Sequence, residues 1–244
     1  MVQLSMENPA QAEEPVRVLV IGAHPDDPEF ACGGTSARWA AEGKEIYYLV
    51  CTRGDKGSSD LEMTSERLVE IREAEQRAAA AVLGVREVNF LPFPDGELAP
   101  TLEFRRAIVR EIRRVRPTIV VTHDPTNVYS ETNINHPDHR AVGTAVLDSI
   151  YPTARDRLNF PDHERDGLAT HKVKEVYLWG AAKPNVWVDV SDSLDRKFEA
   201  LRCHVSQVGK AEQLAERMRE RAKALGEPQG IPHAEAFFKI TMSR

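Results

Sequence analysis

Residues 16–52 read VRVLVIGAHPDDPEFACGGTSARWAAEGKEIYYLVCT, and this stretch decides the fold. A β-branched apolar run at 16–23 is followed by a longer stretch of helical periodicity at 29–43 and by a second apolar run at 44–52. Solid apolar strands that alternate with helices are typical of a mostly parallel sheet with helices on both faces. The stretch therefore predicts an α/β, Rossmann-like fold.

The same alternation continues outward from this stretch as far as residue 150. The expected elements are a helix at 64–84, a strand at 86–93, a helix at 102–116, a strand at 118–123 and a helix near 136–150. Residues 153–174 then break the pattern, because they are polar and have no clear period. We expect this segment to be mobile and to border the mouth of the pocket, since long loops are usually functional.

A smaller C-terminal extension follows the irregular segment. Its expected strands are 175–180 and 186–190, its expected helices are 193–207 and 211–226, and a final apolar run follows at 234–240. The 244 residues suffice for one large core. We expect a loose N-terminal tail at 1–15 and a single domain at 16–244, with a Rossmann-like core at 16–151 and the extension at 152–244.

The composition argues against several classes of protein. The net charge is −6, from 32 basic and 38 acidic residues, whereas nucleic-acid binders usually carry a basic excess. The apolar run Val18–Ala23 is far too short to span a membrane, and three cysteines without CxxC spacing give no disulfide framework. We therefore expect a cytoplasmic protein with no nucleic-acid or membrane partner, and we leave homo-oligomer formation open.

The turn after the first strand carries the first functional signal. It lacks the G-x-G-x-x-G pattern of dinucleotide binders, and the chain has no P-loop, no G-x-S-x-G elbow and no H-E-x-x-H helix. The turn instead holds His24, Asp26 and Asp27. Asp27 before Pro28 also fits a helix N-cap followed by proline. Capping does not explain two crowded carboxylates and an imidazole, whereas a divalent metal would.

A second group of polar residues begins the helix after the fourth strand. Pro137 fits the first helical turn, so His136 and His139 can project to the same side. The first and fourth strands are neighbours in a Rossmann-like order, and ligands bind at their carboxyl ends. Two histidines, a carboxylate and an open position form a catalytic zinc set, so we expect a metal site here. His123 is interpreted as a structural residue only.

These motifs together resemble the PIG-L/LmbE-like zinc deacetylases, which remove acetyl groups from N-acetylglucosaminyl compounds. The resemblance rests on AHPDD at 23–27, GGT at 33–35, REAE at 72–75, FPDGEL at 93–98, HPDH at 136–139 and HVSQ at 204–207. The family fold is a Rossmann-like α/β domain with C-terminal additions. The resemblance implies an amino-sugar substrate, or a conjugate of one, and zinc as cofactor. Fe(II) or another divalent metal is also compatible with such ligands.

The resemblance also implies a role for each matching residue. It makes His24, Asp27 and His139 the metal ligands, Asp26 the general base, His136 the oxyanion-stabilising group, Asp138 the residue that orients His136, and Arg72, Asp95 and His204 substrate contacts. We expect Asp138 to raise the pKa of His136. Arg72 could equally form a surface ion pair with Glu70 or Glu75, and His204 could serve only the helix dipole.

The expected activity is hydrolysis of an acetamide by metal-activated water. Two alternatives remain at this point. An amidase that removes a larger acyl group from an amino-sugar conjugate would use the same residues with a larger pocket. A non-enzymatic metal- or nucleotide-binding module would leave the spare carboxylate of Asp26 without a role, because a closed structural site needs no base.

Overall fold

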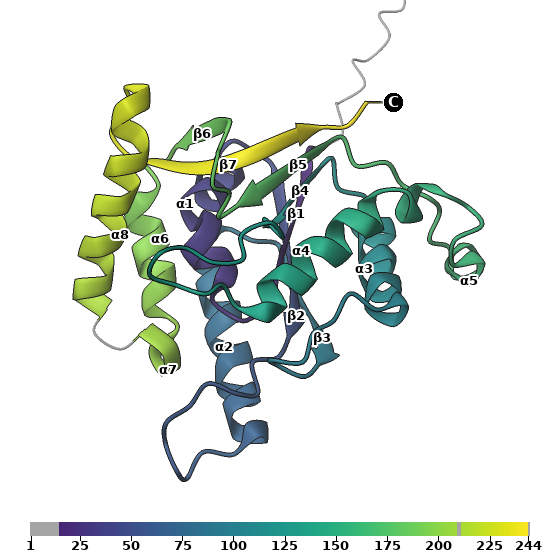
Figure 1. Cartoon of the computed structure of the whole chain (residues 1–244), viewed down its shortest axis with the longest axis horizontal. Coiled ribbons are helices and arrows are strands. Elements are labelled where there is room, and N and C mark those ends of the chain that lie inside the picture. Colours follow the sequence, from purple (N-terminus) through teal and green to yellow (C-terminus); the bar gives the residue numbers. More distant parts are fainter. Residues whose placement is uncertain (1–14, 209–210, 244) are drawn as a thin grey trace, which may run out of the picture.

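The computed structural model describes residues 15–208 and 211–243 and shows one seven-stranded sheet with helices on both faces (Figure 1). The predicted tail at 1–15 lies outside the described residues except for Pro15. The strand order is β3-β2-β1-β4-β5-β7-β6. The strands are β1 Arg17–Gly22, β2 Glu45–Thr52, β3 Glu87–Phe93, β4 Ile119–His123, β5 Glu175–Trp179, β6 Val186–Asp189 and β7 Ala234–Thr241.

The parallel half of the sheet confirms the expected Rossmann-like order. β1 pairs in parallel with both β2 and β4, and β4 pairs in parallel with β5. The apolar residues of β1 and β4 are buried because helices cover both faces, which explains why the strands are solid apolar blocks. The chain reverses its direction of strand addition between β1 and β4, and their carboxyl ends mark the place where such folds bind ligands.

The helices form one layer on each face of the sheet. One layer contains α1 Asp27–Ala41, α2 Ser65–Leu83 and α6 Leu194–Arg202, which pack on the sheet through residues such as Trp39, Leu83 and Ala200. The other contains α3 Leu102–Val115 and α4 Pro137–Ile150, with Ile108 and Val142 in its core. The remaining helical segments are Thr153–Arg155, α5 Pro161–Arg165, α7 Val205–Val208, α8 Ala211–Gly226 and Glu227–Gln229.

The C-terminal strands extend the same sheet in the antiparallel direction. β7 lies between β5 and β6 and is antiparallel to both. The three apolar runs expected past residue 174 are therefore strands, and their order differs from their order in the chain. None of the helices in the described part of the chain is long and apolar enough to cross a membrane.

The segment 153–174 lies at the amino ends of the parallel strands, whereas its predicted place was at their carboxyl ends. α4 starts at the carboxyl edge, and its 14 residues carry the chain about 21 Å to the amino edge. There Lys174 N–H donates to Thr118 O, just before β4. The buried Arg113 side chain donates to five backbone carbonyls of this segment. The expectation that the segment borders the pocket is wrong, because α4 leads away from the site.

Candidate metal centre

The candidate site lies where β1 and β4 end and where α1 and α4 begin. His24 follows β1, His123 ends β4, and His139 lies in the first turn of α4. α4 approaches β4 closely: a Cβ on Gly143 would lie only 2.6 Å from the carbonyl oxygen of His123, so glycine is required there. This approach places the imidazoles of His123 and His139 in a stack with 4.2 Å between ring centroids.

The turn between β1 and α1 has a strained backbone at Asp26. This residue has φ 103° and ψ −28°, a backbone conformation that residues other than glycine rarely adopt. Its N–H donates to Gln76 Oε1 at 2.9 Å, and Arg72 Nη2 donates to Pro25 O at 2.8 Å. Two residues of α2 therefore hold the turn in place from behind.

Asp27 uses its carboxylate inside the turn and does not cap the helix. Asp26 occupies the N-cap position, and Asp27 Oδ2 accepts from the backbone N–H groups of Ala23 at 2.9 Å and His24 at 2.8 Å. The capping interpretation of Asp27 is therefore wrong. Although burial acts in the opposite direction, His139 and His123 hold the pKa of Asp27 well below its usual range. The Asp27 carboxylate is thus anionic at neutral pH.

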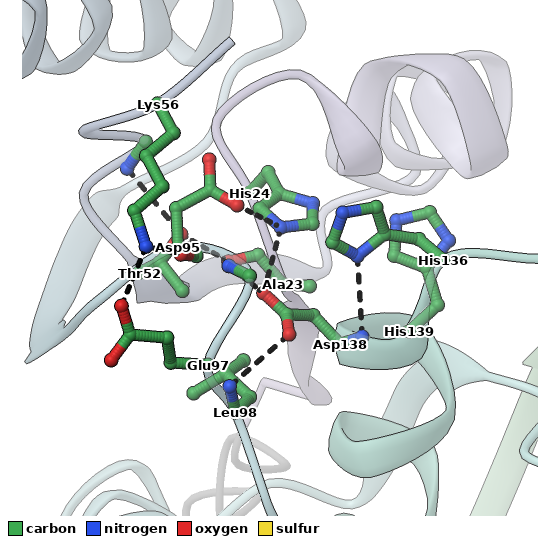
Figure 2. A network of polar contacts seen from close by, with 12 residues as sticks. Ala23, His24, Thr52, Lys56, Asp95, Glu97, Leu98, His136, Asp138 and His139 are labelled. Carbon is green, nitrogen blue, oxygen red and sulfur yellow. Dashed lines mark hydrogen bonds and ion pairs between the residues drawn. The ribbon is translucent and has the colours of Figure 1, made fainter.

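The Nε2 atom of His24 lies between the carboxylates of Asp95 and Asp138 (Figure 2). Nε2 is 3.0 Å from Asp95 Oδ1 and 3.1 Å from Asp138 Oδ2, while Nδ1 is 3.6 Å from Asp27 Oδ2. Burial works against the charged imidazole, but hydrogen bonds to these three carboxylates raise its pKa to about 12. Because Nε2 donates to a carboxylate, Nδ1 is the nitrogen that can face a metal.

The predicted ligands have the donor atoms that a metal requires. His139 Nε2 is 3.2 Å from Asp27 Oδ1, and its Nδ1 is 3.0 Å from Asn135 Oδ1, so the side-chain amide can orient the ring. Two ligands of a tetrahedral zinc lie about 3.4 Å apart. The distance from His139 Nε2 to Asp27 Oδ1, 3.2 Å, is close to that value, and His24 Nδ1 lies 3.6 Å from the other carboxylate oxygen, Oδ2. These residues therefore fit a divalent metal.

The wider cluster contains three overlapping groups of potential ligand atoms within 4.8 Å of one another. The groups are His24, His136 and His139; His24, Asp95, His136 and Asp138; and Asp27, His123 and His139. His139 belongs to two of them, with His24 in one and Asp27 in the other. The structure thus brings together the two motifs that the sequence analysis connected, and it adds His123 and Asp95.

His123 is the residue that the sequence analysis missed. Its Nε2 is 3.2 Å from Asp27 Oδ2, and its Nδ1 accepts from Trp179 Nε1 at 3.0 Å. Burial lowers the pKa of His123 to about 4, so the ring is neutral. The interpretation of His123 as structural only is wrong. Its position at the end of β4, at the same edge as His24, could have indicated the site.

The contacts of His136 and Asp138 differ from the expected ones. The Asp138 carboxylate accepts from Gly96 N at 2.7 Å, from Leu98 N at 3.1 Å and lies on His24, whereas only its backbone N–H reaches His136 Nδ1, at 3.2 Å. Asp138 therefore orients His24. Burial, and then the neighbouring His24, lower the pKa of His136, so the expected rise is wrong.

Asp26 and Arg72 lie next to each other beside the cluster. Arg72 Nη2 is 3.6 Å from Asp26 Oδ2, and Arg72 Nη1 is 3.7 Å from Asp95 Oδ2. Burial and the neighbouring Asp27 raise the pKa of Asp26 to about 7. The alternative of a surface ion pair for Arg72 is wrong, because its side chain is buried; Glu75 instead accepts from Ser206.

His204 is fully buried and contacts Glu29 of α1. Its Nε2 is 3.2 Å from Glu29 Oε2, and Glu29 Oε1 accepts from Gln76 Nε2 at 2.9 Å. The predicted substrate contact of His204 stays a prediction, and its observed partner is Glu29. His204 ends a buried chain of hydrogen bonds that passes through Glu29 and Gln76 to the backbone of Asp26.

A cavity of about 220 Å³ opens beside the cluster. Asp27, His123, His139 and Trp179 line its inner side, and residues of α8 line the opposite side. The cavity is accessible from solvent, so a small molecule can reach the candidate ligands from it.

Comparison with known proteins agrees with the resemblance seen in the sequence. A family model described as PIG-L, GlcNAc-PI de-N-acetylase, matches residues 19–150. Diacetylchitobiose deacetylase of Thermococcus kodakarensis is 36% identical over 191 residues, which cover 78% of this chain and 70% of that protein. A 1D-myo-inositol 2-acetamido-2-deoxy-alpha-D-glucopyranoside deacetylase of Mycobacterium sp. (strain KMS) is 27% identical, over 85% of this chain and 79% of its own.

Solved structures show the same fold. N,N'-diacetylchitobiose deacetylase from Pyrococcus horikoshii superposes with a TM-score of 0.84 at 29% identity, covering 92% of this chain and 84% of that one. A conserved protein from Thermus thermophilus, TT1542, gives 0.77 at 28% identity, covering 93% of this chain and 96% of that one. Both matches extend well beyond residue 150, so the similarity includes the C-terminal strands.

Proposed function

Because the chain belongs to the PIG-L, GlcNAc-PI de-N-acetylase family, we propose that it is a hydrolase that removes the acetyl group from an N-acetylglucosamine-containing small molecule. The observation that carries this proposal is the spare carboxylate of Asp26, which interacts with the charges of Asp27 and His24, beside the contacts of Asp27 with His24 and with His139 that suit a metal. A purely structural metal site would need no such base.

The donor set suits zinc, and His24, Asp27 and His139 would hold it. Two imidazoles and one carboxylate leave an open position, as in catalytic zinc sites, and Fe(II) is compatible with the same ligands. When bound, zinc polarises the acetamide carbonyl and makes water acidic enough to attack at neutral pH. Asp138 and Asn135 hold the outward nitrogens of His24 and His139, respectively, and thereby fix how the rings face the metal.

The remaining residues move the protons and stabilise charge. Asp26 accepts a proton from the attacking water, and this proton balances the one that the leaving amine requires when the C–N bond breaks. His136 accepts a backbone hydrogen bond at Nδ1, so its Nε2 carries a proton that can stabilise the oxyanion. Arg72 and Asp95, beside His24, are our candidates for contacts with the sugar hydroxyls.

The test combines metal analysis with acetate release. The purified protein should contain about one zinc per chain and should release acetate from N,N'-diacetylchitobiose or from N-acetylglucosamine. His24→Ala and His139→Ala should lose both the metal and the activity, whereas Asp27→Asn should bind the metal more weakly. His171→Ala serves as the control, because His171 contacts Pro117 O before β4, at the opposite edge of the sheet. Full metal content in both alanine variants would contradict the ligand assignment.

The second candidate function is the removal of an acyl group larger than acetyl. The cavity of about 220 Å³ beside Asp27 and His139 exceeds what an acetyl methyl group needs. A series of N-acyl glucosamines from acetyl to hexanoyl separates the two functions. A kcat/KM that rises with acyl length would favour the amidase, and a kcat/KM that falls would favour the deacetylase.

A further inference from the structure

Trp179 and His123 form a buried pair at the carboxyl edge of the sheet. They lie opposite each other in the parallel register of β4 and β5. Both are more than nine-tenths buried, and their rings meet edge to face with 4.6 Å between centroids. The indole Nε1 donates to His123 Nδ1 at 3.0 Å. The far nitrogen of the imidazole, Nε2, is 3.2 Å from Asp27 Oδ2.

The indole fixes which nitrogen of His123 carries the proton. A tryptophan Nε1–H can only donate, so His123 Nδ1 must accept, and the ring proton is on Nε2. Nε2–H therefore donates to Asp27 Oδ2. Ala23 N, 3.3 Å from the same Nε2, does not donate to it, because Nε2 has no free lone pair. Ala23 N instead donates to Asp27 Oδ2 at 2.9 Å.

This arrangement distinguishes the two oxygens of Asp27. Oδ2 accepts from three N–H groups, those of Ala23, His24 and the His123 ring. A carboxylate oxygen with three donors has little capacity left for a metal. Oδ1 is 3.2 Å from His139 Nε2 and is the oxygen that remains for a metal. The orientation of the Asp27 carboxylate thus depends on a side chain in β4.

We propose that His123, held as an Nε2–H donor by Trp179, is a positioning residue that presents Asp27 Oδ1 to the metal and is itself excluded from the ligand set. The inference rests on the proposed metal-dependent function. Although His123 lies within ligand distance of Asp27 and His139, coordination through Nε2 would require its proton to leave or to move to Nδ1, where the indole N–H of Trp179 already donates, and would break the contact with Asp27. The site therefore keeps three protein ligands and an open position.

The test measures metal affinity directly, without turnover. Metal-free protein is titrated with Zn²⁺ against a chromogenic chelator, and with Co²⁺ while its visible absorption is recorded. His123→Leu removes the N–H and should weaken Zn²⁺ binding about 10–100-fold, as the loss of such an orienting partner does elsewhere. His123→Gln keeps an N–H donor at the same reach and should restore the affinity with an unchanged Co²⁺ spectrum. Tyr177→Phe is the matched control, because Tyr177 lies on the same face of β5 two residues before Trp179 and its hydroxyl donates to Glu175, away from the site.

Several outcomes would overturn the inference. If His123→Gln loses as much affinity as His123→Leu and alters the Co²⁺ spectrum, His123 is itself a ligand. If His123→Leu binds Zn²⁺ like the wild type, the contact orients nothing. Should His123→Leu fail to fold, Trp179→Phe removes the indole N–H and keeps an aromatic ring at this position. It should change the Co²⁺ spectrum because Nε2 can then bind, and an unchanged spectrum would refute the inference.

The wild-type titration separates this inference from the proposed function. A wild type that binds no metal would overturn both. A wild type that binds zinc and releases acetate, together with variants that show no change, would overturn only the role of His123.

Discussion

Replacing Gln76 by leucine should slow catalysis while leaving the metal site filled. Gln76 is fully buried in α2, accepts from the N–H of Asp26 and donates to Glu29. Leucine has a similar size but offers neither atom. The backbone of Asp26, held at φ 103°, then loses its partner and can relax toward ordinary helical angles. The metal ligands His24 and Asp27 keep their own contacts.

The expected loss of stability follows from the two polar groups that lose their hydrogen-bond partner. The N–H of Asp26 and Oε1 of Glu29 each lose a buried hydrogen bond of 2.9 Å, and each such loss costs about 1–3 kcal/mol. We therefore expect the free energy of unfolding to fall by about 2–6 kcal/mol. A displacement of the base by about 1 Å costs about 10²-fold in kcat, because the base and the attacking water must be held at the correct distance and angle for proton transfer.

The assay measures kcat, bound metal and urea unfolding on the same preparations. Glu70→Gln, on the exposed side of the same helix, is the control and should change stability by less than about 0.5 kcal/mol. We expect Gln76→Leu to bind about one metal per chain and to turn over about 10²-fold more slowly. A folded, metal-loaded Gln76→Leu with wild-type kcat would refute the argument that α2 positions the base.

Three further predictions concern other residues. Asp26→Asn should keep the metal and lose about 10²–10⁴-fold in kcat, because an amide cannot accept the proton; unchanged turnover would assign the base elsewhere. Arg113→Met should lower the free energy of unfolding by about 3–5 kcal/mol, since five carbonyls lose their donor, with kcat per folded molecule unchanged; a loss of kcat would place 153–174 at the site after all. Burial lowers the pKa of His163, so below about pH 6.5 the unfolded chain binds a proton that the folded chain does not, and stability falls as the pH falls. His163→Phe should remove that part of the pH dependence in urea unfolding between about pH 5 and 7, and an identical slope in both proteins would contradict this.

Residues 16–150 could be predicted from the sequence because local pattern and burial agree there. The run expected as a strand at 16–23 is β1, and the helix expected at 102–116 is α3, each within a residue or two at either end. The direction of β7 and its place between β5 and β6 could not be predicted, because an apolar run does not indicate which strands it pairs with. The place of 153–174 depends on the length of α4 and on a buried arginine, neither of which an irregular stretch reveals.

The candidate site was predictable where it depends on strand ends. The neighbouring places of β1 and β4 imply that His24 and Asp27 meet His139, and their contacts confirm the proximity of the two motifs. The partners of Asp138 were not predictable, because Gly96 and Leu98 reach it from a loop 40 or more residues away. His123 was missed since a single histidine that ends an apolar strand looks like a core residue.

The distance along the chain between the two halves of the site links metal binding to folding. His24 and Asp138 touch although they are 114 residues apart, so the site exists only after β1 and β4 have paired. An unfolded chain would have to close a loop of that length before it could chelate, and a metal should therefore bind almost only to the folded protein. At a free metal concentration about 1,000 times the Kd, this linkage adds about 4 kcal/mol to the free energy of unfolding. On the proposed function, the supply of metal would then set the stability of the folded protein as well as its rate of turnover.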